Sequence, residues 1–317
     1  MKEMLQYSQA VKAALTEGKP VLALESTVIT HGLPYPQNLE TARELEKTAR
    51  ELGVTPATII LIDGTVHIGL EESDFVCLAE LTQQAQADKT LLKKLAQRDL
   101  VLAMAQKWSG GTTVSATLHL ANLARIKVFA TGGIGGVHRD WQESLDISAD
   151  LHALANHPVI IVTAGCKAIL DIPTTLEQLE TLCVPVYGWQ TDRCPAFYTK
   201  DSPYPIDRVD SIVSITEAYK AQAAMQRMLG GCEKGTALVV MNPIPSAYSV
   251  PSEVMEPFIR QALQEAEQLG IRGKASTPFL LQKLAVITAG ESVKANLELL
   301  KNNVRLGSKI AAALAEN

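Results

Sequence analysis

Two aspartates that lie four residues apart could together bind a metal ion. Asp146 and Asp150 flank Ser148 in the segment LDISAD, which follows a run of glycines. If this segment is helical, both carboxylates lie on the same side of the helix. Carboxylate ligands without a thiolate or an imidazole favour Mg²⁺ or Mn²⁺. Aspartates are also stabilised at the start of a helix by its dipole, so a solvated acidic helix start fits the same spacing.

A lysine and a glutamate that follow apolar segments could do covalent and proton chemistry. Lys167 follows VIIVTAGC, and partial desolvation there would favour the neutral amine that Schiff-base chemistry requires. An ordinary exposed lysine fits this position as well. Glu25 interrupts the apolar segment VLALEST at its end and is either a capping acceptor or a proton donor. Nothing near Cys166 resembles a Cys–His pair, so it is expected to be a small packing residue.

The glycine-rich segment TGGIGG, residues 131–136, superficially resembles a dinucleotide-binding motif. That motif requires a helix directly after the glycines and an acidic residue about 20 residues later, at the end of the next strand. Here the glycines lead into VHRDWQESLD, which is polar and interrupted. The segment therefore predicts a turn that needs positive φ angles, which does not exclude contact with a ligand.

A further anion site could lie at residues 112–117, TTVSAT, where a helix is expected to begin. The free N–H groups of a first helical turn can bind an anion, and capping by Thr112 or Thr113 is the alternative. Lys94, in LLKKL, is by itself a solvated charge. His31 and His138 fall in loops after strands, where a donor to the site and a surface histidine are both open.

The elements that must position these residues alternate along the chain. Apolar segments of strand length are interspersed with helical patterns, which predicts an α/β fold with a mainly parallel central sheet and helices on both faces. No linker is visible, so one domain over residues 1–317 is expected. In such sheets ligands bind where the strands end, which places Glu25, the glycine segment and Lys167 at one edge. Strands are expected at 21–27, 57–63, 126–133, 158–165, 184–189 and 237–243, and the longer helices at 36–53, 71–84, 114–124, 252–269, 277–287 and 292–314.

The composition argues against several classes of protein. The 317 residues carry a net charge of −5 and 5% aromatic residues, which argues against a general nucleic-acid surface. The N-terminal segment has no long apolar run, so neither a signal peptide nor a membrane span is expected. The five cysteines show no zinc-ligand spacing, and their odd number suits reduced thiols in the cytoplasm.

Several long segments resemble the pseudouridine-5′-phosphate glycosidase family, which includes indigoidine synthase A-like proteins. They are, in this order, ALESTVITHGLPYPQN, GGTTVSATLHLANLARIKVFATGGIGGVHR, LDISADL, VTAGCKAILD, PAFY and GKASTPFLL. The resemblance extends from about residue 19 to about residue 312. It implies a three-layer α/β/α fold, a homotrimer, and a C-glycosidase of the hydrolase or lyase class. The implied reaction is the reversible cleavage of pseudouridine 5′-phosphate to uracil and ribose 5-phosphate, in pseudouridine degradation.

The resemblance also implies roles for individual residues of this chain. Lys167 matches the nucleophile and Glu25 the proton donor. Asp146 matches the ligand of one Mn²⁺ per subunit, for which Mg²⁺ could substitute. The chain departs from the family pattern at Trp141, which adds bulk after the glycines, and at Cys166, where a small apolar residue is more usual. The positions that match substrate-binding residues are Lys94, Val114, Ser148, Ala149, Asp150 and Asn296.

The bond that this family breaks joins two carbon atoms, so the carboxylate pair of ordinary glycosidases would be insufficient. The resemblance implies that the sugar ring opens and that Lys167 adds at C1′. Protonation of uracil C5 then leaves a ribose 5-phosphate imine, which water hydrolyses. Two other hypotheses stay open: a Schiff-base carbon–carbon lyase of the aldolase kind, which would also use Lys167, and a phosphometabolite-binding protein without activity.

Overall fold

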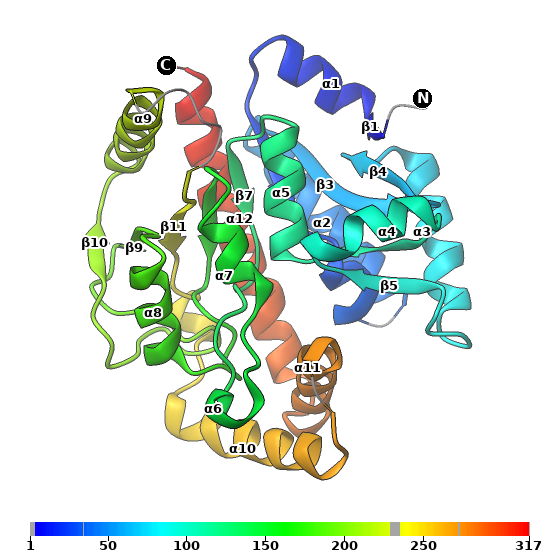
Figure 1. Cartoon of the computed structure of the whole chain (residues 1–317), viewed down its shortest axis with the longest axis vertical. Helices are drawn as coiled ribbons and strands as arrows, with labels where there is room; N and C mark the ends of the chain where they lie inside the picture. The colour runs from blue at the N-terminus through cyan, green and yellow to red at the C-terminus, as the bar shows by residue number, and fades with distance from the viewer. Residues whose placement is uncertain (1–3, 34, 229–234, 272, 317) are drawn as a thin grey trace.

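A sheet of eleven strands runs through the molecule (Figure 1). The computed structural model describes residues 4–33, 35–228, 235–271 and 273–316. Along the main path the strand order is β1-β4-β3-β2-β7-β8-β11-β9-β10, and off this path β6 pairs with both β3 and β5. The strands are β1 (Leu5–Tyr7), β2 (Val21–Leu24), β3 (Thr55–Ile62), β4 (Thr65–Ile68), β5 (Leu92–Leu95), β6 (Ser109–Thr112), β7 (Val128–Ala130), β8 (Ile160–Thr163), β9 (Val186–Trp189), β10 (Asp207–Val209) and β11 (Leu238–Met241).

The sheet is mainly parallel, as the sequence predicts. Only two pairings among these strands are antiparallel, and both involve β3, which pairs in this way with β4 and β6. The central strands β2, β7, β8 and β11 are buried at every position. Strands that are covered on both faces have near-continuous apolar sequences instead of alternating ones, and this explains why VLAL and IIVT are readable as strands.

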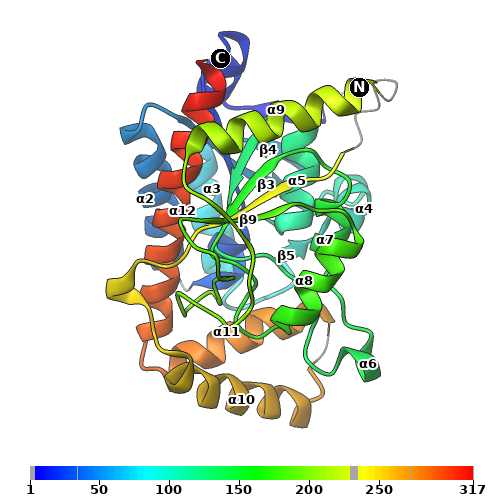
Figure 2. The ribbon, with the colours of Figure 1, turned by 90° about the vertical axis from the view of Figure 1, so that its left-hand side faces the viewer.

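Helices cover both faces of the sheet and complete a three-layer α/β/α arrangement. In Figure 2, α2 and α12 lie on one side of the sheet, and α5 and α7 lie on the other. Within the described residues no helix is both long and apolar enough to cross a lipid bilayer. The helices are α1 (Gln9–Thr16), α2 (Gln37–Glu51), α3 (Glu72–Gln84), α4 (Leu100–Ala105), α5 (Val114–Leu123), α6 (Trp141–Ser144), α7 (Ala149–Leu154), α8 (Ile172–Thr181), α9 (Ile212–Met228), α10 (Ser252–Gln268), α11 (Ser276–Ile287) and α12 (Glu291–Ala315), with a π-helical turn at Val28–Gly32 and 3₁₀ turns at Gln97–Asp99, Ser246–Tyr248 and Gly273–Ala275.

The predicted strands and longer helices are confirmed, with ends that differ by a few residues. Several elements escape the prediction, among them α9, β5 and β6. The helix α9 buries only Ile215 and Thr216 among its described residues, so its apolar residues do not form a clear stripe. The strand β6 has the sequence SGGT, and glycine is depleted in strands, so composition disfavours it.

The condition for a shared helical face of the two aspartates is not met. The helix α7 begins at Ala149, with Ser148 as its N-cap, so Asp150 is helical and Asp146 is not. Asp146 lies in an extended segment whose backbone pairs with the end of the glycine loop, where His138 N donates to Asp146 O at 3.1 Å. The two carboxylates therefore reach the same region from a loop and from a helix, and not from one helical face.

Candidate active site

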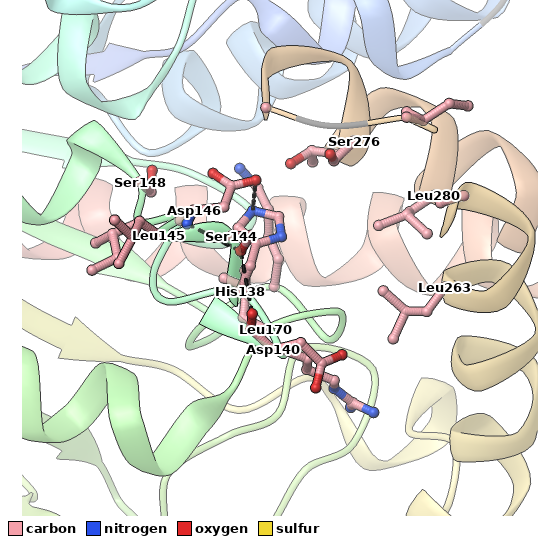
Figure 3. A pocket seen from close by; sticks show the side chains of 18 of the residues that line it. His138, Asp140, Ser144, Leu145, Asp146, Ser148, Leu170, Leu263, Ser276 and Leu280 are labelled. Carbon is pink, nitrogen blue, oxygen red and sulfur yellow. Dashed lines mark hydrogen bonds and ion pairs between the residues drawn. The ribbon is translucent and has the colours of Figure 1, made fainter. Parts of the chain in front are cut away.

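A cavity of about 970 Å³ lies beyond the ends of the central strands (Figure 3). Loops that follow the strands form one side of it, and the paired helices α10 and α11 form the other. Ser276 and Leu280 of α11 lie across the cavity from His138 and Asp146 (Figure 3). Six predicted site residues line the cavity and are thus brought together by the fold: Lys94, Asp146, Ser148, Ala149, Asp150 and Lys167.

Lys167 is held by backbone hydrogen bonds just beyond β8. Its N–H donates to Ile134 O at 3.1 Å, and its carbonyl accepts from Leu170 N at 3.0 Å. The segment around Lys167 is therefore tied to the glycine loop beside it. Cys166 is fully buried, and burial raises the pKa of its thiol well above the ordinary value. The thiol stays protonated at neutral pH, as expected for a small packing residue.

Glu25 lies at the same edge of the sheet, directly after β2. Its two carboxylate oxygens accept hydrogen bonds from the hydroxyls of Thr27 and Thr131. Thr131 is fully buried, so its hydroxyl can hold the carboxylate in one orientation. Glu25, Val114 and Asn296 are not among the described residues that line the cavity. The side chain of Asn296 faces the glycine loop, because its Oδ1 lies 3.4 Å from the point where a Cβ on Gly132 would sit.

Asp150 joins the glycine loop to the start of α5. Its Oδ1 accepts from Ser115 N and its Oδ2 accepts from Gly135 N, both at 2.9 Å. The residue is 4% exposed, so the carboxylate serves two backbone groups of the protein itself. The sequence predicts that the first-turn N–H groups of α5 could bind an anion. One of them, Ser115 N, already donates to the carboxylate of Asp150. None of the glycines in residues 131–136 has a positive φ angle, so the predicted turn with positive φ angles is wrong. Gly135 is required for space instead, because a Cβ would lie 2.2 Å from Ser148 Oγ.

Asp146 is half-buried and faces His138. The distance from Asp146 Oδ2 to His138 Nε2 is 4.0 Å. Burial lowers the pKa of His138, with Lys167 and Lys94 acting in the same direction and Asp146 opposing them. Across the described residues no group of three or more His, Cys, Asp or Glu side chains converges as a ready-made metal site. Asp140, Glu143, Asp150 and Glu267 also line the cavity, but they do not converge with Asp146 on one point. A cation held by Asp146 would therefore be a hard divalent ion that keeps most of its water and takes further oxygens from a ligand.

Lys94 reaches the cavity from β5, a strand that the sequence does not predict. It is therefore a cavity residue, and the expectation of an isolated solvated charge is wrong. His31 belongs to the π-helical turn, where its Nδ1 lies 2.8 Å from Thr30 Oγ1. Burial, assisted by the positive charge of Lys94, lowers the pKa of His31 to about 4. His31 is thus a partly buried, neutral side chain near Lys94, and not a surface histidine.

The helix pair α10–α11 supplies a wall that the sequence does not reveal as part of the site. Leu263 of α10 and Leu280 of α11 give it an apolar surface, and Ser276 adds a hydroxyl (Figure 3). Arg139, from the opposite side, donates to Glu256 of α10 at 2.7 Å. The sequence signal for this wall was the segment GKASTPFLL, which contains Ser276 and Leu280 but does not show that α10 packs beside them.

Comparison with known proteins places the whole chain in one group. A family model described as "Indigoidine synthase A like protein" matches residues 10–313. The "Pseudouridine-5′-phosphate glycosidase" of Caldanaerobacter subterraneus subsp. tengcongensis is 49% identical over 315 residues, which cover 99% of this chain and 98% of that one. The protein of the same name from Escherichia coli is 46% identical over 310 residues, or 98% of this chain and 95% of the relative.

Two solved structures share the fold over nearly their full length. One is the prealnumycin C-glycosynthase AlnA in complex with ribulose 5-phosphate, with a TM-score of 0.86 and 34% identity, covering 100% of this chain and 98% of that chain. The other is an indigoidine synthase A-like protein from Thermotoga maritima, with a TM-score of 0.85 and 32% identity, covering 98% and 96%. These likenesses extend over both sides of the cavity.

Proposed function

Because the chain belongs to the indigoidine synthase A-like family, we propose that it cleaves pseudouridine 5′-phosphate to uracil and ribose 5-phosphate. The observation that carries this proposal is the position of Lys167, which lines a cavity of about 970 Å³ together with Lys94, Asp146 and Ser148. Pockets of about 300 to 1,000 Å³ are typical of small-molecule sites, so a nucleotide-sized ligand fits.

Cleavage of the C–C bond requires an electron sink at C1′ and a proton at uracil C5. In our proposal the ribose ring opens and the Lys167 amine forms a bond to C1′. The C1′–C5 bond then breaks as C5 takes a proton, which leaves a lysine imine of ribose 5-phosphate. Water hydrolyses the imine, releases the sugar phosphate and restores the amine. Each step can run backward, so the reaction is reversible.

Glu25 is the proposed proton donor to uracil. Its support comes from Thr27 and Thr131, whose hydroxyls hold both carboxylate oxygens. Such fixed contacts orient a proton donor toward one atom of a bound substrate. Asn296, which faces the glycine loop near Gly132, is proposed to bind the uracil ring of the substrate.

The phosphate is proposed to bind between Lys94 and Ser148, which both line the cavity, with help from water on the bound metal ion. Val114, which begins α5 and does not line the cavity, is proposed as a further substrate contact. Ala149 contributes backbone at the start of α7. Asp150 is assigned a supporting role, because its oxygens already accept from Ser115 and Gly135.

Asp146 is the proposed ligand of one Mn²⁺, with His138 beside it. The cation would supply positive charge next to the oxygens of the substrate. We further propose a cytoplasmic homotrimer of one-domain subunits that works in pseudouridine degradation and acts as a C-glycosidase of the hydrolase or lyase class.

The decisive test is uracil release from pseudouridine 5′-phosphate, followed by ultraviolet absorbance with Mn²⁺ and after chelation. Release that depends on metal is expected, and absence of uracil would contradict the proposed activity. The Lys167→Ala variant should bind ribose 5-phosphate but lose turnover, which also separates the enzyme from a binding protein. Borohydride in the presence of ribose 5-phosphate should attach the sugar to Lys167, and attachment at Lys94 would overturn the assigned roles.

A further inference from the structure

An ion pair joins α10 to the end of the glycine loop. Arg139 donates from Nη1 to Glu256 Oε1 at 2.7 Å and from Nη2 to Glu256 Oε2 at 3.1 Å. Both side chains are 29% exposed, so water screens the pair only in part. A bidentate pair of a guanidinium and a carboxylate fixes the relative orientation of the two groups as well as their distance. The pair can therefore determine how the helix sits against the loop.

Arg139 bridges the two sides of the cavity. It follows His138 directly, and its Nη2 also lies 3.4 Å from the carbonyl of Ala168, next to Lys167. Glu256 belongs to α10, whose residues Leu263 and Gln264 line the opposite side. Among the ion pairs of the described residues, this is the one that joins α10 to the strand-side loops. Figure 2 shows α10 and α11 beneath this end of the sheet.

The surroundings of Glu256 favour its charged carboxylate form. Hydrogen bonds from Arg139 lower the pKa of Glu256, against the effect of burial and with help from Arg260. Arg260 lies one turn later on α10 and donates to Glu256 Oε1 at 3.1 Å. Glu256 thus holds two arginines that line the cavity, although it is not itself among the described lining residues.

We infer that Arg139 and Glu256 are positioning residues that hold α10 as a wall of the cavity and thereby set the affinity for the substrate. The identity of that substrate rests on the proposed function. Lys167 is held separately through its backbone contact with Ile134. Loss of the pair is therefore expected to weaken binding and to leave the chemical step largely intact, because only states with the wall in place bind well.

The substitution Glu256→Gln keeps the shape of the side chain and removes its charge. We expect the KM for pseudouridine 5′-phosphate to rise about five- to tenfold with kcat changed less than about twofold, as for loss of a partly buried pair. Hydrogen exchange should accelerate in α10. The matched control is Glu72→Gln, which removes the two-pronged Arg43–Glu72 pair between α2 and α3, and it should leave KM and the exchange of α10 unchanged.

A double variant tests whether the two residues act together. Glu256→Gln weakens the contact with Arg260 as well as the pair with Arg139. If both Arg139→Gln and Glu256→Gln act through the Arg139–Glu256 pair, the double variant should be no worse in KM than Glu256→Gln alone. The inference is overturned if the KM increases of the two single variants multiply in the double variant, or if kcat falls while KM stays constant. It is also overturned if Glu256→Gln keeps the KM and the α10 hydrogen exchange of the wild type. If the wild-type protein releases no uracil, the proposed function is wrong but the inference about the ion pair is still testable. Hydrogen exchange of α10 and calorimetric binding of ribose 5-phosphate to wild type and Glu256→Gln then decide the role of the pair.

Discussion

Replacing Asp150 by alanine is expected to lower the free energy of unfolding by about 3 kcal/mol, because two buried N–H groups lose a charged acceptor. The carboxylate of Asp150 accepts from Ser115 N and Gly135 N at 2.9 Å each, in a side chain that is 4% exposed. Each orphaned group costs about 1 to 3 kcal/mol. Two such groups would together cost about 2 to 6 kcal/mol. Both N–H groups belong to residues that line the cavity, where water can reach them after truncation, so the loss should lie in the lower half of this range.

Urea unfolding of the wild type and the variant measures this difference at equal m-value. Asp171→Ala is the control, because the carboxylate of Asp171 caps α8 through one contact, from Thr174 N at 3.0 Å. Loss of a single N-cap costs about 1 kcal/mol. If Asp150→Ala is destabilised no more than Asp171→Ala, the carboxylate is not the structural link that its geometry indicates.

Two further variants test other parts of the structure. Burial, with the charges of His119 and His152, lowers the pKa of His157 to about 4. Below about pH 6.5 the unfolded chain therefore binds more protons than the folded one. The free energy of unfolding should fall by up to about 3 kcal/mol as the pH drops toward 4. Urea unfolding at several pH values should show that this fall is smaller in His157→Gln than in the wild type. For Gly135→Ala, whose Cβ would lie 2.2 Å from Ser148 Oγ, uracil release should fall about 100-fold. Gly132→Ala, with neighbours no closer than 3.4 Å, should lose far less, and equal losses would contradict the steric argument.

Most of the architecture could be predicted because its signals are local. Strands covered on both faces leave continuous apolar segments, so VLAL and IIVT are visible without any knowledge of their partners. Helix ends are marked by their own residues, as where α2 begins directly after Pro36. The helix α9 shows the limit of this approach, since a helix with two buried residues among those described has no strong apolar stripe.

The candidate site was predictable only in outline. The rule that ligands gather where parallel strands end placed Glu25, the glycine loop and Lys167 at one edge before any contact was known. Whether Asp146 and Asp150 share a helical face stayed open in the sequence, and they do not, because α7 begins only at Ala149. Spacing in the sequence predicts proximity only if the local conformation is right.

By itself, the sequence determined the α/β class, the family and the residues available for chemistry, because these depend on periodicity and on motifs of neighbouring residues. Only the tertiary structure decided what each side chain contacts. Asp150 meets Ser115 across 35 residues, and Arg139 meets Glu256 across 117. Such pairs leave no periodic pattern, since a hydrogen bond depends on the positions of two backbones that the whole fold brings together.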